Sequence, residues 1–285
     1  MTDVIERTET LDPTSAYALG DLLGVPVPDL ADGAGLPPLW HWVYLLDRPP
    51  FADLGVDGHP VRGTLPAPPG PGLRRMWAGG RVTTSRPLRC GAPATKRTRV
   101  VSVAEKDGRS GRLTFVTVGH QVLQGGSVVV EEEQDIVYRD AAAAPATAQP
   151  GAAPRAEVPA GEGEREIGIS PTVLFRFSAL TYNAHRIHYD RDYCRDVEGY
   201  PGLLTHGPLQ ALAMAEAARA VGGGADGRTG DVSFSYRLVA PLFDDQGLFV
   251  SAAGGPDGPD GMTSTAVRDR YGRQTATGTL QALGG

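Results

Sequence analysis

The two halves of this chain carry the same order of predicted elements, and a proline-rich segment separates them. That segment, residues 141–163, contains four prolines and has no periodic apolar face. Such a composition predicts an exposed, semi-extended linker. We therefore divide the 285-residue chain into a first unit of residues 1–140 and a second unit of residues 164–285.

The first half reads as one helical segment followed by four strands. Residues 38–46 form an apolar run that predicts a helix, and a long loop rich in glycine and proline follows at residues 55–72. The last strand candidate is rich in β-branched and aromatic residues, and Gly125-Gly126 before it predicts a two-residue hairpin. The strands are expected at residues 80–87, 94–106, 111–124 and 127–138.

The second half repeats this order with a clearer helix. Residues 207–221 have a proline in the first turn and glycines after the last, which predicts a well-delimited helix. Only Gln210, Glu216 and Arg219 are polar within it, so we expect burial on nearly all sides. Strands are expected at residues 230–238, 248–253, 262–269 and 274–283.

A similar junction occurs once in each half. Residues 81–91 and residues 233–247 both contain a strand, then Pro-Leu, then a turn that ends in glycine. A helix followed by a sheet, made twice with this shared junction, predicts a duplicated α+β unit. The alternative is two unrelated halves with ordinary turns.

Charge and cysteine content exclude several classes of function. The formal net charge is −6 and the sequence pI about 5.5, so no basic field is available to hold nucleic acid. Cys90 and Cys194 are the only cysteines, which indicates neither a disulfide framework nor a zinc finger. We find no secretory signal and no apolar run near the ~20 residues of a membrane helix. We expect a soluble protein of the reducing cytoplasm.

The densest group of chemically active side chains lies between residues 177 and 190. Within about eight residues it combines an amide, two imidazoles, a guanidinium and a carboxylate, a set that suits proton transfer beside a carbonyl group. A His-Gly-Pro sequence at residues 206–208 then opens the buried helix. The members of the group are Asn183, His185, Arg186, His188 and Asp190.

A helix wrapped by antiparallel sheet, made twice in one chain, resembles the double hotdog fold, an α+β architecture. Residues 183–188 resemble the hydratase-2 motif of MaoC-like enoyl-thioester hydratases and hydroxyacyl-thioester dehydratases. The run at residues 178–190 is similar to the subgroup of mesaconyl-C4-CoA and itaconyl-CoA hydratases, as are residues 36–44 and 132–139. The resemblance therefore covers most of the chain.

The usual motif of that family is Gly-Asp-x-Asn-Pro-Leu/Ile/Val-His. When its last histidine is placed on His188, its catalytic aspartate falls on Asn183, which removes a carboxylate. The family's oxyanion-hole glycine, at the start of the central helix, falls on Gly207. The resemblance thus implies three catalytic positions: His188, Asn183 and Gly207.

Hydration of an enoyl thioester needs a base for water, an acid for the α-carbon and donors for the enolate oxygen. We expect His188 to shuttle the proton, because an ordinary histidine pKa of about 6.5 gives it both states near neutral pH. The Gly207 N–H would stabilise the oxygen, a contribution of about 3 kcal/mol. Asn183 would hold the water through its amide oxygen and nitrogen. His185 or Asp190 is the alternative second proton-transfer group.

Four further positions are assigned to substrate binding, each with a structural alternative. His185 could instead form loop hydrogen bonds, and His206 could order the turn before the helix. Arg186 suits a carboxylate or phosphate, or else a surface salt bridge. The four positions are Tyr182, His185, Arg186 and His206.

The remaining candidates are interpreted as structural. We expect Asp190 to cap a helix at residues 191–197, Cys194 to be buried packing, and Glu131–Glu133 with Asp135 to form a solvated strand edge. The aromatic residues Trp40, Trp42 and Tyr44 are assigned to the core. The histidines without a partner motif are His41, His59 and His120. The first half should therefore be catalytically silent, covering the second half and shaping the acyl tunnel.

The resemblance implies a hydratase or dehydratase acting across the α,β double bond of an acyl thioester. A short branched enoyl-CoA such as mesaconyl- or itaconyl-CoA is the favoured substrate, with neither metal nor redox cofactor. Coenzyme A, or the phosphopantetheine of an acyl-carrier protein, would belong to the substrate. The alternatives are a β-hydroxyacyl-carrier-protein dehydratase, a repurposed hotdog cyclase in secondary metabolism, or a non-catalytic thioester-binding module. Association into a homodimer is left open.

Overall fold

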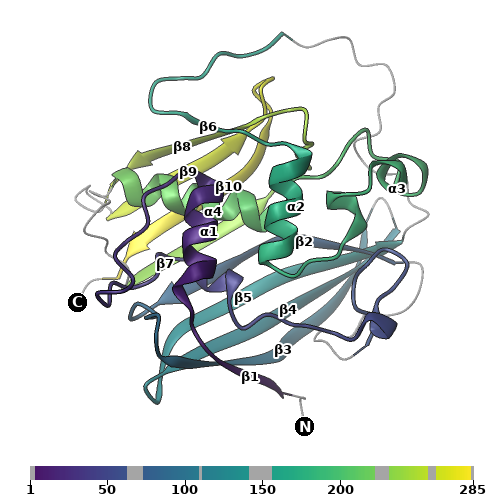
Figure 1. Ribbon diagram of the computed structural model, residues 1–285. Coiled ribbons are helices and arrows are strands. Elements are labelled where there is room, and N and C mark those ends of the chain that lie inside the picture. Colours follow the sequence, from purple (N-terminus) through teal and green to yellow (C-terminus); the bar gives the residue numbers. More distant parts are fainter. Residues whose placement is uncertain are drawn as a thin grey trace.

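The computed structural model describes residues 4–62, 73–108, 111–140, 156–221, 231–255 and 261–283. One antiparallel sheet of ten strands curves around the helices (Figure 1). The first five strands are β1 (Val4–Thr10), β2 (Leu73–Thr84), β3 (Pro93–Gly108), β4 (Gly111–Gln124) and β5 (Ser127–Asp140). The other five are β6 (Arg165–Ile167), β7 (Val232–Leu238), β8 (Leu248–Gly254), β9 (Met262–Arg268) and β10 (Gln274–Ala282).

The strand order is symmetric about the centre of the sheet. It runs β1-β3-β4-β5-β2-β7-β10-β9-β8-β6, so each strand of the first half has a counterpart at the same distance from the centre. The central strands β2 and β7 pair antiparallel, with Arg81 opposite Ser235. The two similar junctions seen in the sequence both begin on these strands. The predicted α+β double hotdog is confirmed.

Four α-helices and three short 3-10 helices accompany the sheet in the described part of the chain. The α-helices are α1 (Pro13–Leu23), α2 (Pro171–Leu180), α3 (Arg191–Asp196) and α4 (Gly207–Val221). The 3-10 helices are η1 (Trp40–Val43), η2 (Phe51–Asp53) and η3 (Arg186–His188). Helix α4 has the predicted bounds and packs against β8, β9 and β10, with even Gln210 and Glu216 buried. Helices α1 and α2 lie side by side (Figure 1).

Sequence analysis missed α1 and α2, although both carry a recognisable start signal. Asp12 and Ser170 accept hydrogen bonds from the first turns, and a proline follows each of them. A side-chain cap followed by proline is a typical helix start. Strands β1 and β6 were also missed, and both lie at the outer edges of the sheet.

The helix expected at residues 38–46 is wrong. Only the four-residue η1 forms there, because Leu39 and Leu45 on either side adopt left-handed backbone conformations, with φ of 69° and 53°. Such residues cannot continue a right-handed helix. In the order of elements η1 holds the place that α4 holds in the second half.

The strands agree more closely with expectation. β4 has the predicted bounds, and the Gly125-Gly126 turn joins β4 to β5, with both glycines at positive φ. β2 begins at Leu73 rather than at residue 80 and contains a register shift between Trp77 and Gly79. Of the expected linker, residues 141–155 lie outside the described residues, and residues 156–163 form no regular element. In the described part of the chain, every helix is too short or too polar to cross a membrane.

Candidate active site

Both halves of the chain line one cavity of about 1070 Å³. The second half contributes α2, residues 181–185 and Pro208 in the first turn of α4. The first half contributes η1, residues 54–61 and side chains from β2 to β5. The cavity is thus bordered by η1 and four strands of the first half and by α2 and the loop that follows it in the second half.

His188 ends η3 with its ring almost buried, at 7% exposure. It is not itself a lining residue of the cavity, but its neighbours His185 and Ile187 are. Its Nδ1 is 2.8 Å from the carbonyl oxygen of Leu204. Because a carbonyl can only accept, Nδ1 carries the hydrogen and Nε2 keeps its lone pair. Burial lowers the pKa of His188 to about 4, against which the Leu204 bond acts weakly. The ring is therefore a neutral base at pH 7.

His206 holds His188 against the start of α4. The two rings stack with centroids 3.6 Å apart and an interplanar angle of 18°. His206 Nε2 is 2.9 Å from Ser178 Oγ, and its side chain is buried, which agrees with a role in ordering the turn. The next residue is Gly207, where a Cβ would lie 2.2 Å from a methyl group of Leu238. The His188 ring therefore packs on the residue that immediately precedes Gly207, the predicted oxyanion site at the start of α4.

Asn183 uses its amide oxygen inside its own loop. Asn183 Oδ1 accepts a 3.0 Å hydrogen bond from the backbone N–H of His185, and its own N–H donates to Ser178 O at 2.8 Å. The side chain still lines the cavity, so its amide N–H groups are the part that can hold a water. Tyr182, at φ 52° and 56% exposed, lines the cavity rim.

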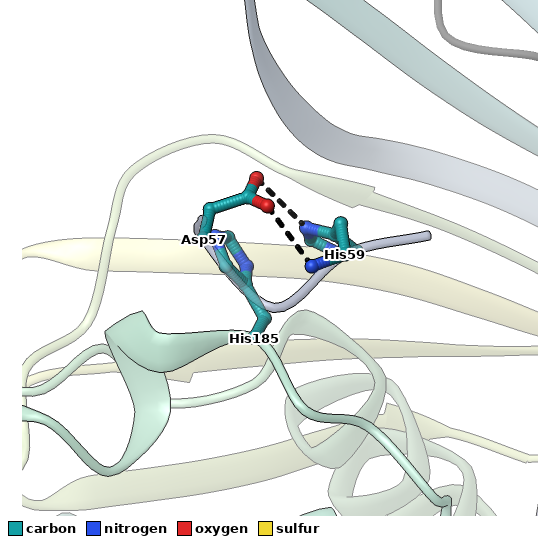
Figure 2. Close-up of side chains that lie close together, drawn as sticks. All are labelled: Asp57, His59 and His185. Atoms are coloured by element: carbon teal, nitrogen blue, oxygen red, sulfur yellow. Dashed lines mark hydrogen bonds and ion pairs between the residues drawn. The ribbon is translucent and has the colours of Figure 1, made fainter. Parts of the chain in front are cut away.

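Asp57 and His59 of the first half lie close to His185 of the second half (Figure 2). Asp57 Oδ2 is 3.5 Å from His59 Nδ1, and the ring centroids of His59 and His185 are 3.9 Å apart. The His185 ring in turn lies 5.5 Å from that of His188. His59, which has no partner motif in the sequence, therefore contacts a candidate site residue. Nothing in the sequence around residues 55–61 signalled this contact, which joins the two halves of the chain.

The same three side chains place one ligand atom each within 4.8 Å of the others, a spacing that could hold a metal ion. Burial lowers the pKa of both His59 and His185, and the nearby positive charge of Arg75 lowers both further. A guanidinium at this position also opposes a bound cation. The cluster therefore brings together the Asp57 carboxylate and the positive charge of Arg75, one charge of each sign.

Arg186 takes the structural alternative. Its Nε and Nη2 bind Asp190 Oδ2 at 3.0 and 2.7 Å, and Nη1 donates to Val56 O at 3.1 Å. Its guanidinium also lies 4.1 Å from the centre of the Tyr193 ring, and it is not a lining residue of the cavity. Asp190 caps α3 through the Tyr193 N–H, as predicted, so its carboxylate is committed to structure.

A second polar cluster lies on the first half's side of the cavity. Glu132 binds His41 Nε2 at 2.8 Å and Trp42 Nε1 at 3.0 Å and is 5% exposed, so the predicted solvated strand edge is wrong at this residue. The reason is that β5 lies inside the sheet, between β4 and β2. Burial would raise the pKa of Glu132, but the hydrogen bond and charge of His41 outweigh it and lower the pKa to about 2. Nearby His120 binds Thr98 Oγ1 at 2.9 Å.

The remaining expectations divide between core and cavity. Trp40 and Tyr44 are buried in the core, as expected, and Trp40 donates to Glu216 Oε1 at 2.8 Å. Trp42 is partly buried against this core, and both Trp42 and Tyr44 also line the cavity. Cys194 is fully buried, and burial raises the pKa of its thiol to about 11, so it is packing rather than a nucleophile.

Comparisons with known proteins agree with this geometry. The family model of hydroxyacyl-thioester dehydratase type 2 matches residues 39–244. The chain is 42% identical over 280 residues to mesaconyl-C(4)-CoA hydratase of Chloroflexus aurantiacus, covering 95% of this chain and 92% of that protein.

Solved structures support the fold. A MaoC-like dehydratase from Phytophthora capsici superimposes with a TM-score of 0.68 at 15% identity, covering 99% of this chain and 96% of that one. A Mycobacterium tuberculosis protein with a double hotdog fold gives a TM-score of 0.53 at 15% identity, covering 99% and 96%. The chain therefore belongs to the hydroxyacyl-thioester dehydratase type 2 family of MaoC-like double hotdog proteins and is a hydratase or dehydratase of acyl thioesters.

Proposed function

We propose that this protein adds water to, and removes it from, a short branched dicarboxylyl-CoA of the mesaconyl type. The observation that carries the proposal is the neutral His188 stacked on His206 immediately before Gly207, beside a cavity lined by both halves. The extent and identity of the match to the mesaconyl-C(4)-CoA hydratase support the substrate class.

In the proposed reaction, Nε2 of His188 takes a proton from a water while the oxygen of that water bonds to the β-carbon. The electron pair of the double bond moves toward the thioester, and the N–H of Gly207 stabilises the resulting enolate oxygen. The imidazolium of His188 then returns the proton to the α-carbon, which completes the addition of water. The Asn183 amide N–H groups hold the water. The side chains named above supply the proton transfers and the Gly207 N–H stabilises the enolate, and the addition involves no net oxidation or reduction. We therefore propose neither a resident metal nor a redox cofactor.

The test is a hydration assay with mesaconyl-C4-CoA, itaconyl-CoA and crotonyl-CoA, which follows the absorbance of the enoyl thioester. We expect the wild-type protein to hydrate the mesaconyl-type substrate and His188→Ala to lower kcat/KM by about 10³-fold, since it removes the general base. Thermal unfolding of the variant controls for its fold.

Two results would contradict the proposal. Tight binding of every thioester without turnover would identify a non-catalytic binding module, and full activity of His188→Ala would remove His188 from the mechanism. A marked preference for acyl-carrier-protein thioesters over the CoA thioesters would identify the carrier-protein alternative.

A further inference from the structure

Arg75 places a positive charge in the cavity. It lies on β2 directly across from Tyr138 of β5, and both side chains line the cavity. Burial raises the pKa of the Tyr138 hydroxyl, while the charge of Arg75 and a hydrogen bond between the two side chains act in the opposite direction. The guanidinium is therefore held beside Tyr138, facing the same enclosed space.

Arg75 differs from the other basic residues of the cavity in having no carboxylate partner. The basic residues of the lining are Arg74, Arg75 and Lys96. Arg74 Nε lies 2.8 Å from Glu198 Oε2, and Lys96 Nζ lies 3.8 Å from Asp47 Oδ1 with the charge of Glu132 also nearby. Within the described ranges of the chain, no ion pair includes Arg75. Its planar guanidinium remains available to a carboxylate, which it can bind with two parallel hydrogen bonds.

The position of Arg75 relates it to the reacting centre. Arg75, His59 and His185 all line the same cavity, and the charge of Arg75 contributes to the low pKa of both imidazoles. The His185 ring lies 5.5 Å from that of His188, measured between ring centroids. Arg75 therefore faces the same cavity as the ring that adjoins the proposed base.

We propose that Arg75 binds the free carboxylate of the acyl group and so selects dicarboxylyl thioesters over monocarboxylyl ones. This inference rests on the proposed function, because it names the group that recognises the far end of the same substrate. The carboxylate supplies the counter-charge that no carboxylate among the described residues gives to Arg75. An aliphatic acyl chain of equal length would leave the guanidinium unpaired, which is costly in an enclosed site.

The first test measures binding without turnover. Succinyl-CoA and butyryl-CoA have acyl chains of the same length, lack the reactive double bond and differ in the terminal carboxylate. We expect Arg75→Leu to weaken succinyl-CoA binding at least 30-fold relative to butyryl-CoA, as measured by calorimetry, and Arg75→Lys to recover part of the loss. The matched control is Arg81→Leu on the same strand, whose guanidinium pairs with Glu133 at the surface. It should leave the ratio unchanged.

The second test compares kcat/KM for mesaconyl-C4-CoA and crotonyl-CoA. In Arg75→Leu the ratio of the two values should fall about 100-fold, with thermal unfolding as a control for the fold. An equal loss with both substrates, or an unchanged binding ratio, would overturn the role of Arg75. If the wild-type protein prefers succinyl-CoA through Arg75 but hydrates no thioester, the proposed reaction fails while the carboxylate site stands.

Discussion

Gly58 is a position where only glycine fits, and it lies where the first half meets the loop of the active site. Its φ is +85°, and a Cβ added there would lie 1.9 Å from the carbonyl oxygen of Ala184. The same two loops are also joined by a 2.8 Å hydrogen bond from the backbone N–H of Arg186 to the carbonyl oxygen of Asp57. Glycine at residue 58 thus allows the loop that carries Asp57 and His59 to reach His185.

Gly58→Ala should destabilise the protein and displace His59 from His185. We expect a loss of about 2–4 kcal/mol in the free energy of unfolding, from the left-handed backbone and the clash together. The control is Gly91→Ala, at φ +81° with no atom within 4 Å of the added Cβ, which should cost about 1–2 kcal/mol. Urea unfolding measures both variants. Equal losses would show that the contact with Ala184 is not a constraint.

The parts of the site that the sequence revealed are those that lie close together along the chain. Asn183, His185 and His188 fall within six residues, so their pattern alone indicated proton chemistry. Asp57 and Arg75 gave no such signal, because a loop contact and a strand register bring them to the cavity. Neither kind of long-range contact leaves a periodic trace in the sequence.

At the scale of elements, strands were easier to predict than helices. β4 and β5 are bounded by a Gly-Gly turn and contain β-branched residues, so their limits could be read directly. The apolar run at residues 38–46 looked helical, but the backbone at Leu39 and Leu45 confines it to the single turn η1. Residues of η1 and the segment that follows it line the cavity instead.

The hydrogen bond from Trp40 to Glu216 joins η1 to α4 and thus the two halves of the fold. Trp40 Nε1 donates to Glu216 Oε1 at 2.8 Å, and both side chains are buried. Trp40→Phe removes the donor to Oε1 and should lower the free energy of unfolding by about 2–4 kcal/mol, from the hydrogen bond that Oε1 loses and the lost volume.

A double-mutant cycle isolates the hydrogen bond from the packing. The three variants are Trp40→Phe, Glu216→Ala and the double variant, and urea unfolding of each should give a coupling energy of about 1–2 kcal/mol. Glu216→Ala also removes the ion pair with Arg219, but this loss occurs with either Trp or Phe at residue 40 and therefore cancels in the cycle. Strictly additive losses would mean that the hydrogen bond between Trp40 and Glu216 contributes nothing to holding the two halves together.

At the scale of the whole molecule, burial in and around the cavity lowers the pKa of five imidazoles. Burial is the largest cause of a lowered pKa in each of them, and mutual proximity adds to it for the rings around His185. The five residues are His59, His120, His185, His188 and His206. Folding therefore excludes protons that the unfolded chain would bind, and stability becomes coupled to pH.

The protein should lose stability steeply as the pH falls below about 6.5, the ordinary histidine pKa that applies in the unfolded chain. The unfolded state then binds protons that the folded state cannot, so the free energy of unfolding is highest above that pH. For His188, with a folded pKa of about 4, the loss on reaching pH 4 is roughly 3 kcal/mol. Urea unfolding at pH 7.5, 6.5 and 5.5 measures how the free energy of unfolding changes with pH, which gives the number of protons taken up on unfolding. His120→Gln should lower that number by up to one. A free energy that stays constant across this range would mean that the imidazoles are charged or hydrated in the folded protein.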